Sequence, residues 1–142
     1  MRKNLKRLQS NINGSSAVEF AIVFPVFILA TLTMIGYGIY ISAAASVQQI
    51  TADAARAAIA GLSIVERQSL AIDFVTAAMS DRPFIDPVRV TTTVRESASL
   101  AGSLTVQIDY DAKNLPIWGL FSYTLPDHQI ISRTSVVRIG GI

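Results

Sequence analysis

A long run without charged residues constrains the fold of this chain more than any other feature. From Phe20 to Ala52, 33 consecutive residues include no Asp, Glu, Lys, Arg or His. Its most apolar part, Phe20 to Val47, would measure about 42 Å as a helix at ~1.5 Å per residue, more than the ~30 Å hydrocarbon core of a bilayer. The run predicts a transmembrane helix, placed at residues 15–47, that tilts or continues beyond the membrane.

The positive charges of the chain are concentrated in front of this run. Residues 1–14 form a basic leader with a local charge of +4, from Arg2, Lys3, Lys6 and Arg7. The remaining 128 residues have eight Lys or Arg and ten Asp or Glu, hence −2. Basic residues tend to stay on the cytoplasmic side, so residues 48–142 are predicted to form an exported periplasmic or extracellular domain. Nucleic-acid binding, which requires a basic surface on a folded domain, is not expected.

Three features of the apolar run favour a helix that packs against other helices. Glu19 lies at its cytoplasmic edge, where an ionised side chain is expensive and normally has a partner. Pro25 removes a backbone donor and crowds the carbonyl of Ala21. A strip of small residues allows close approach of a second helix: Gly36, Gly38, Ser42 and Ala45. Each feature alone also fits an ordinary membrane anchor.

A cleavable secretory signal peptide is the competing interpretation of the run. Ala43-Ala44-Ala45 would supply the small residues of its cleavage site. The apolar region of such a peptide is about 7–15 residues long, however, and this run is much longer. The length therefore favours a helix that the mature chain keeps.

The junction between the leader and the helix follows a specific order of residues. Its elements are Gly14, the four residues Ser15 to Val18, then Glu19, Phe20, Pro25, a glycine-containing middle and an alanine-rich end before Gly61. Over about residues 10–61 this order resembles type IV prepilins, specifically the TadE/TadF-type pseudopilins of tight-adherence (Flp) pilus systems.

The resemblance implies a processing site and an assembly site. A membrane aspartyl prepilin peptidase would cut between Gly14 and Ser15, which makes Glu19 the fifth residue of the mature chain. During assembly Glu19 would meet the amino terminus of a neighbouring subunit, with Phe20 and Pro25 in the same assembly segment. An ammonium beside a carboxylate in a low dielectric offsets the cost of the isolated charges. The opposing interpretation of Glu19 is an interfacial acid without a partner.

The resemblance also implies a function and a set of partners. The chain would be a pseudopilin or minor pilin needed for assembly of a Flp-type pilus, anchored once in the bacterial inner membrane with a cytoplasmic N-terminus. Its partners would be the membrane, the prepilin peptidase and other pilin or pseudopilin subunits. Entry into the fibre, and TadE against TadF type, are left open. The alternative is an uncleaved signal-anchored envelope protein whose exported domain is a binding or scaffold module.

Helical periodicity predicts how the exported domain begins. The long helix would continue to about residue 60 as an amphipathic stalk, with an inner face of Val47, Ile50, Ala54 and Ala58 and with Gly61 as its C-cap. Asp53 and Arg56 would pair on the solvated face. A second helix would start at the capping box Ser63–Glu66 and end near Arg82, before Pro83. Its predicted apolar stripe is Leu70, Ala71, Phe74 and Ala78.

Alternating residues predict three strands after this helix. Val88 to Arg95 and Leu104 to Tyr110, joined by a turn across Ser97–Gly102, form a hairpin with one buried face. The third strand, about Gln129–Ile139, alternates poorly and is expected to have a bulge or to be covered on both sides. The predicted class is α+β and pilin-like: a long N-terminal transmembrane helix, a short helix and a small three-stranded antiparallel sheet.

An aromatic loop joins the last two predicted strands. Leu115–Pro126 is apolar, is bounded by prolines and contains Trp118, Phe121 and Tyr123. The loop either covers the edge of the sheet as part of the core or contacts another subunit through Trp118 and Phe121.

Residues typical of an active or metal site are missing from the sequence. There is no cysteine, and His128 is the one histidine, so a thiolate or multi-histidine metal site is not expected. The chain has no GxSxG elbow and no glycine-rich phosphate loop. We therefore expect no enzyme activity, no cofactor, no metal and no small-molecule substrate.

Overall fold

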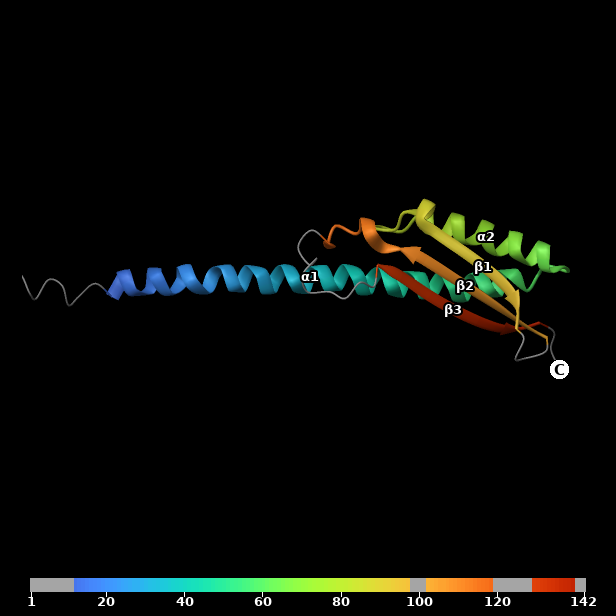
Figure 1. Cartoon of the computed structure of the whole chain (residues 1–142), viewed down its shortest axis with the longest axis horizontal. Coiled ribbons are helices and arrows are strands. Elements are labelled where there is room, and N and C mark those ends of the chain that lie inside the picture. Colours follow the sequence, from blue (N-terminus) through green and yellow to red (C-terminus); the bar gives the residue numbers. More distant parts are fainter. Residues whose placement is uncertain (1–11, 98–101, 119–128, 140–142) are drawn as a thin grey trace, which may run out of the picture. The chain divides into compact units, whose positions relative to one another are not determined.

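The computed structural model describes residues 12–97, 102–118 and 129–139, with side chains from residue 16 onward. The elements are α1 (Ile12–Ala58), α2 (Ile64–Ser80), the short 3-10 helix η1 (Pro87–Arg89), β1 (Val90–Glu96), β2 (Ser103–Asp111), the 3-10 helix η2 (Ala112–Asn114) and β3 (Ile130–Arg138) (Figure 1). They confirm the predicted α+β class. The chain divides into two compact units, residues 1–36 and 37–142.

Some predicted features fall outside the described residues. They are the basic leader up to residue 11, most of the predicted turn Ser97–Gly102, and the side chains Phe121, Tyr123 and His128.

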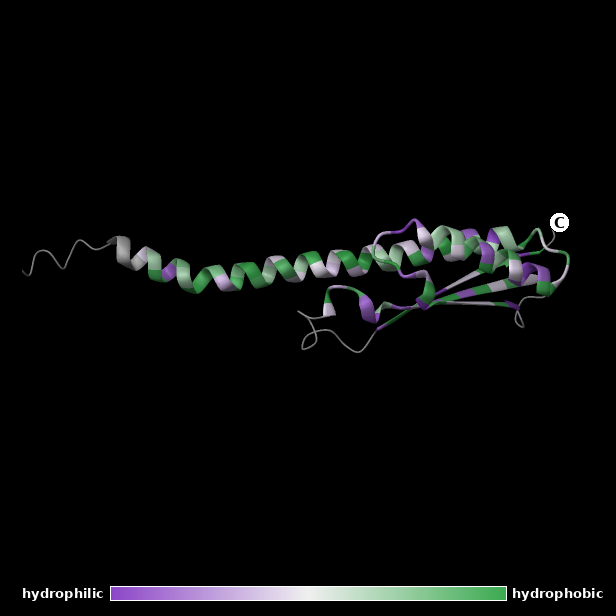
Figure 2. Cartoon of the chain, turned by 90° about the horizontal axis from the view of Figure 1, so that it is seen from above, coloured by the Kyte–Doolittle hydropathy of each residue, from purple (hydrophilic) through white to green (hydrophobic). Residues whose placement is uncertain are grey.

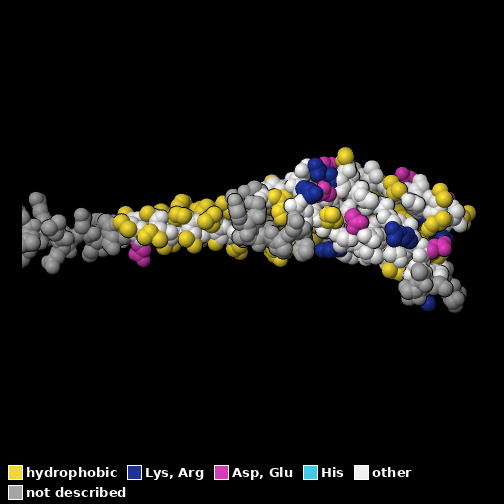
Figure 3. All heavy atoms as spheres, viewed as in Figure 1, with side chains coloured by type: hydrophobic (Ala, Val, Ile, Leu, Met, Phe, Trp, Pro, Cys, Tyr) yellow, Lys and Arg dark blue, Asp and Glu magenta, His cyan; other side chains and the backbone are white. Residues whose placement is uncertain are grey.

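In the first unit, α1 presents large apolar side chains outward on all its sides. The exposed residues include Phe20, Ile22, Val23, Val26, Phe27, Leu29 and Met34, and hydrophobic atoms cover this part of the helix in Figure 3. Among the described residues, α1 is the one helix long and apolar enough to cross a membrane. Its most apolar 18-residue window has a mean hydropathy of 2.3, and none of it is buried. Figure 2 shows the same stretch as mostly hydrophobic ribbon.

In the second unit, two helices cover one face of an antiparallel sheet. The strand order is β1-β2-β3, so β2 is central. Its register places Val106 between Val94 of β1 and Ser135 of β3. The part of α1 after Gly36 and the whole of α2 lie on the same side of the sheet (Figures 1 and 2). The domain therefore has two layers, and its core lies between them.

The core is built from alternate residues of β2 and one face of α1. Leu104, Val106, Ile108 and Tyr110 are all buried, as their alternation predicts. The predicted inner face of α1 is also confirmed, and it is extended by further alanines: Val47, Ile50, Ala54 and Ala58, with Ala43, Ala44 and Ala55. Each fully buried aliphatic side chain stabilises the fold by about 1.5–3 kcal/mol. The buried hydroxyl of Thr51 donates to the carbonyl of Val47 at 2.7 Å.

α2 begins as predicted but buries a different row of residues. The hydroxyl of its N-cap, Ser63, accepts from the N–H of Glu66 at 3.2 Å. The Glu66 carboxylate accepts from the N–H of Leu62 at 2.8 Å. The buried row is Ala71, Val75 and Met79, whereas Leu70 is half-buried and Phe74 is exposed. The predicted stripe was wrong at Leu70 and Phe74, because the sheet contacts the row of residues that starts one position later.

β1 starts two residues later than predicted. Val88 belongs to η1 and is 90% exposed, so it is not part of the buried face. The carboxylate of Asp86 accepts from the N–H of Val88 at 3.1 Å. The ring of Pro87, which lies between them, fixes its own φ angle. An Asp followed by Pro favours a turn here over the continuation of the strand.

The connection from α2 to η1 contains a strained residue. Phe84 has a φ of 67°, which is rare for a bulky side chain, and its ring is half exposed. The carbonyl of Phe84 accepts from the hydroxyl of Tyr110 at 3.1 Å. Burial raises the pKa of the Tyr110 hydroxyl above its ordinary value of 10.0, so the hydroxyl stays protonated as the donor.

β3 is continuous and is covered on one side only. It pairs with β2 without interruption, from Ile130 opposite Asp111 to Arg138 opposite Ser103. Ile131 is buried under the helices, whereas Ile130 and Val136 are 61% and 55% exposed on the other face. The predicted bulge or double coverage was therefore wrong. The adjacent apolar pairs place one residue on each face of a regular strand.

Gly61 follows α1 for a different reason from the one predicted. It is not in the left-handed conformation of a glycine C-cap; among the described glycines, that conformation occurs at Gly102, with a φ of 74°. A Cβ at Gly61 would lie 2.7 Å from the backbone nitrogen of Arg67. The glycine is needed because the start of α2 passes too close for any side chain.

Candidate assembly segment

The predicted processing site lies in the first turn of α1. The helix begins at Ile12, so the bond between Gly14 and Ser15 follows its third residue. The first N–H groups of a helix have no partner within it, and a glycine in a helix costs about 1 kcal/mol relative to alanine. The predicted processing site therefore lies where the helix has the fewest internal hydrogen bonds.

Glu19 lies on the exposed surface of α1, five residues after Gly14. Within the described part of the chain it forms no hydrogen bond and no ion pair. Its neighbours are apolar: the rings of Phe20 and Phe24 contact each other in a tilted arrangement with centroids 5.2 Å apart. An ionised carboxylate at the margin of such a helix is stabilised by a partner of opposite charge.

Pro25 lies inside α1 without ending the helix. Because proline has no N–H, the carbonyl of Ala21 loses its usual donor. Farther along, Thr31 and Thr33 satisfy their hydroxyls by donating to the carbonyls of Phe27 and Leu29, at 2.9 and 2.8 Å. The backbone therefore lacks one helical hydrogen bond at Ala21, close to Glu19.

The structure divides the predicted strip of small residues. Gly38, Ser42 and Ala45 are exposed, and their spacing of four and three residues places them on one face of the helix. A Cβ at Gly38 would meet nothing within 4 Å. Gly36 is buried and, two positions away, faces the other side of the helix. The strip is therefore corrected to three residues without Gly36.

The described part of the aromatic loop is anchored in its own domain. Leu115 and Ile117 are buried, and Trp118 is half-buried against the core. The indole N–H of Trp118 donates to the carbonyl of Ala112. Phe121 lies outside the described residues, so a contact of Trp118 and Phe121 with another subunit stays a prediction.

A charged cluster at one end of the sheet was not predicted from the sequence. The guanidinium of Arg89 lies 3.5 Å from the carboxylates of both Asp86 and Asp111. Asp111 also accepts from the N–H of Lys113 at 3.0 Å and so caps η2. The cluster ties η1 to η2, which is a structural role. In the described ranges no group of three His, Cys, Asp or Glu is placed to hold a metal ion.

The comparison with protein families points to the same segment. Residues 14–56 match the family model of TadE-like proteins, which confirms the resemblance over Gly14, Ser15, Glu19, Phe20 and Pro25. The match associates the chain with Tad pilus systems and with the membrane. No curated protein and no solved structure matches the chain significantly.

Proposed function

We propose that this chain, TadE-like over residues 14–56, is a pseudopilin or minor pilin that a Flp-type (tight-adherence) pilus system needs for assembly. A prepilin peptidase removes the leader after Gly14, and the mature chain begins at Ser15. The N-terminus starts in the cytoplasm, α1 crosses the inner membrane, and the exported domain lies in the periplasm. The main support is Glu19, a carboxylate on an exposed apolar helix without a partner in the described chain.

Cleavage and pairing together offset the cost of placing the charge of Glu19 in the membrane. Removal of the leader creates an ammonium at Ser15, four residues before Glu19. Even the mildest scales put a charge at the centre of a membrane helix at roughly 2.5–3.5 kcal/mol, and an opposite charge offsets much of that cost. A parallel neighbour shifted by about 6 Å, the rise of four helical residues at ~1.5 Å each, brings its ammonium level with Glu19.

An uncleaved signal anchor with a binding or scaffold domain is the second candidate. One observation favours it: α1 runs through the bond between Gly14 and Ser15 without a break, so the helix accommodates an uncut leader. The intact mass of the chain, purified from cells with an active prepilin peptidase, separates the two. A mass that begins at Ser15 supports the pseudopilin, and a mass that includes residues 1–14 supports the anchor.

The role of Glu19 is tested by Glu19→Gln, which keeps the shape of the side chain and removes its charge. We expect normal insertion and leader removal, with pilus production lowered at least about tenfold, the effect of a loss of ~1.4 kcal/mol. Asp73→Asn is the matched control, because Asp73 is an exposed acid on α2, and it should leave pilus number unchanged. Normal piliation with Glu19→Gln contradicts the assembly role.

A contact of Trp118 and Phe121 with another subunit belongs to the same proposal. Trp118 is only half-buried, so part of its ring is available to a partner. Recovery of pilin subunits from membranes is compared between the wild type and a variant with both aromatics replaced by polar residues. Unchanged recovery assigns this loop to its own domain.

A further inference from the structure

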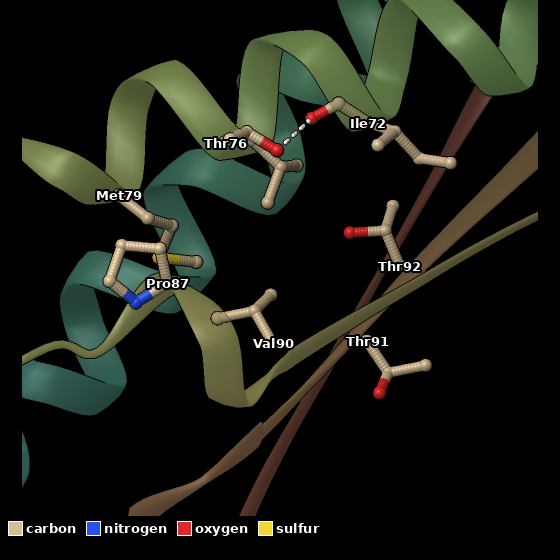
Figure 4. A pocket seen from close by; sticks show the side chains of 8 residues that line it. Ile72, Thr76, Met79, Pro87, Val90, Thr91 and Thr92 are labelled. Carbon is tan, nitrogen blue, oxygen red and sulfur yellow. Dashed lines mark hydrogen bonds between the residues drawn. The ribbon is translucent and has the colours of Figure 1, made fainter.

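The edge of the sheet beside β1 is open beneath α2. β1 pairs with β2 on one side, and no described strand lies on its other side. A cavity of about 260 Å³ opens there between α2 and β1 (Figure 4). Its wall is mainly apolar, from Ile72, Val75, Met79, Pro87 and Val90, with threonines at its margin and no charged residue.

The register shows which backbone groups of β1 face this opening. The N–H of Ser97 donates to the carbonyl of Ser103 at 2.8 Å. These two residues are therefore a hydrogen-bonded pair that continues the register of β1 and β2. In an antiparallel pair such positions alternate, so residues 91, 93 and 95 bond to β2. The N–H and C=O groups of Thr92 and Val94 therefore point away from β2, along the open edge, whereas the N–H of Val90 already donates to the carbonyl of Pro87.

The side chains at these edge positions face the helix layer. Figure 4 shows Val90 and Thr92 extending from β1 toward α2, whereas Thr91 extends to the opposite side. Thr76 of α2 donates its hydroxyl to the carbonyl of Ile72 at 2.8 Å, so it presents its methyl group to the cavity without an unpaired donor. The opening thus combines a free backbone edge with an apolar side-chain pocket.

The helix layer is wider than the sheet that it covers. Helices pack about 8–10 Å apart, whereas strands are about 4.8 Å apart, so two helices cover about four strands. The described sheet has three strands, and α2 runs alongside β1 on the side away from β2 (Figure 1). The space under α2 is therefore where a fourth strand would lie.

We propose that this groove, formed by β1 and α2, binds an extended segment of a partner polypeptide as a fourth strand. Backbone bonds to Thr92 and its neighbours fix the segment, and every second side chain enters the apolar pocket. This is strand addition with side-chain selection at alternate positions. The inference is independent of the proposed pilus function, because it uses only the exported domain.

Three other kinds of occupant fit the groove less well. The cavity is smaller than the ~300–1,000 Å³ typical of small-molecule sites, and it lacks charged groups for an ionic ligand. The free edge of β3 in a second copy does not fit, because its helix-facing side already carries α1, with Ile131 buried. A second helix layer would collide with α2. The occupant is a strand without its own helix cover, with uncharged aliphatic residues such as valine at alternate positions.

The test uses the full chain in detergent micelles and a defined probe. The probe is a seven-residue peptide with a lysine at each end and alternating valine and threonine between them. Its N-terminus is acetylated and its C-terminus is amidated. We expect saturable binding and slower hydrogen exchange of the Thr92 and Val94 amides. A second peptide, N-methylated at the residues that would bond to β1, has the same side chains and should bind at least about tenfold more weakly, because it loses its backbone donors.

Proline substitutions locate the binding edge. Proline is tolerated on an edge strand where the N–H faces outward. Thr92→Pro removes such an N–H at β1, and Thr134→Pro removes one at the free edge of β3. Thr92→Pro should weaken binding about tenfold, whereas Thr134→Pro and Thr92→Val, which keeps the N–H, should bind as the wild type does.

Three results would overturn the inference: no binding of the probe to the wild type, equal affinity of the N-methylated peptide, or equal weakening by Thr134→Pro. If Thr92→Pro fails to fold, the two peptides on the wild-type chain still decide. Loss of piliation has no bearing on this outcome, and a failure of peptide binding leaves the role of Glu19 intact.

Discussion

The two parts of α1 on either side of Gly36 are both apolar, but they differ in the size and in the exposure of their apolar side chains. Before Gly36 the helix carries large side chains such as Phe27 and Met34, and they are exposed. After it, the buried positions are mostly alanines, including Ala44, Ala54 and Ala55. Apolar surface alone therefore does not indicate what covers a helix. Small buried residues mark a close approach to protein, whereas large exposed ones require lipid or other helices.

This difference also accounts for the length of the apolar run. Ala43 and Ala44 are already part of the core, so the helix packs against the domain before its apolar run ends. Ile39 and Tyr40 also pack against this core, so residues 20–38 remain, about 28 Å of helix at ~1.5 Å per residue. That is close to the ~30 Å hydrocarbon core. The limits of the membrane span stay a prediction, but the run no longer exceeds a bilayer.

The largest expected effect compares two isoleucines of the same helix. Ile50 is 2% exposed and Ile22 is 68% exposed. Ile50→Ala should lower the free energy of unfolding of the domain by about 2–5 kcal/mol, and Ile22→Ala should change it by less than about 0.5 kcal/mol. Urea unfolding in micelles, followed by the fluorescence of Trp118, the single tryptophan, measures both. Equal losses would end the distinction between the two parts.

The second prediction enlarges an alanine in each part. Ala54 is buried against the sheet, and Ala30 is exposed. Ala54→Leu overpacks the core and should cost about 1–3 kcal/mol of unfolding free energy. Ala30→Leu adds apolar surface where nothing in the chain opposes it and should be neutral by the same urea assay. A tolerated Ala54→Leu would mean that the helix–sheet contact is looser than the burial indicates.

The smallest effect concerns Tyr110, a polar side chain that the domain pairs internally, whereas Glu19 in the first part of α1 has no partner among the described residues. Tyr110→Phe removes the bond to the Phe84 carbonyl and should cost about 1 kcal/mol of unfolding free energy. Because the folded pKa of Tyr110 is raised above 10.0, the unfolded state loses its proton first as the pH rises. Stability should be unaffected below about pH 10 and should fall above it. The variant should lose this part of the alkaline slope, and an unchanged slope would assign it to other groups.

Patterns that depend on local periodicity were predictable from the sequence. The inner face of α1 at Val47, Ile50 and Ala54 and the N-cap at Ser63 follow from short-range spacing. The strand alternation from Leu104 to Tyr110 follows in the same way. The TadE-like resemblance needed only the order of residues along the chain, and the match over residues 14–56 confirms that resemblance, whereas the roles of Gly14 and Glu19 stay predictions.

Features that depend on which distant part of the chain packs against a residue could not be predicted from the sequence. The burial of Val75 in place of Phe74 depends on how α2 rotates onto the sheet, and both rows are apolar. Gly61 fits a C-cap as well as a close contact until the position of Arg67 is known. The groove beside β1 has no sequence signal, because it results from the different widths of helices and strands.

The burial of Ala43 and Ala44 limits how this protein can exchange parts with others. A chimera that joins a foreign membrane helix directly to residue 48 would discard both alanines and Val47. These three residues belong to the hydrophobic core of the domain, which would lose their contacts. A junction at or before Tyr37 keeps the compact unit of residues 37–142 whole. Recombination between such chains is therefore expected to succeed only at crossover points at or before Tyr37, so the apolar part of α1 can be exchanged but the turns that pack on the domain cannot.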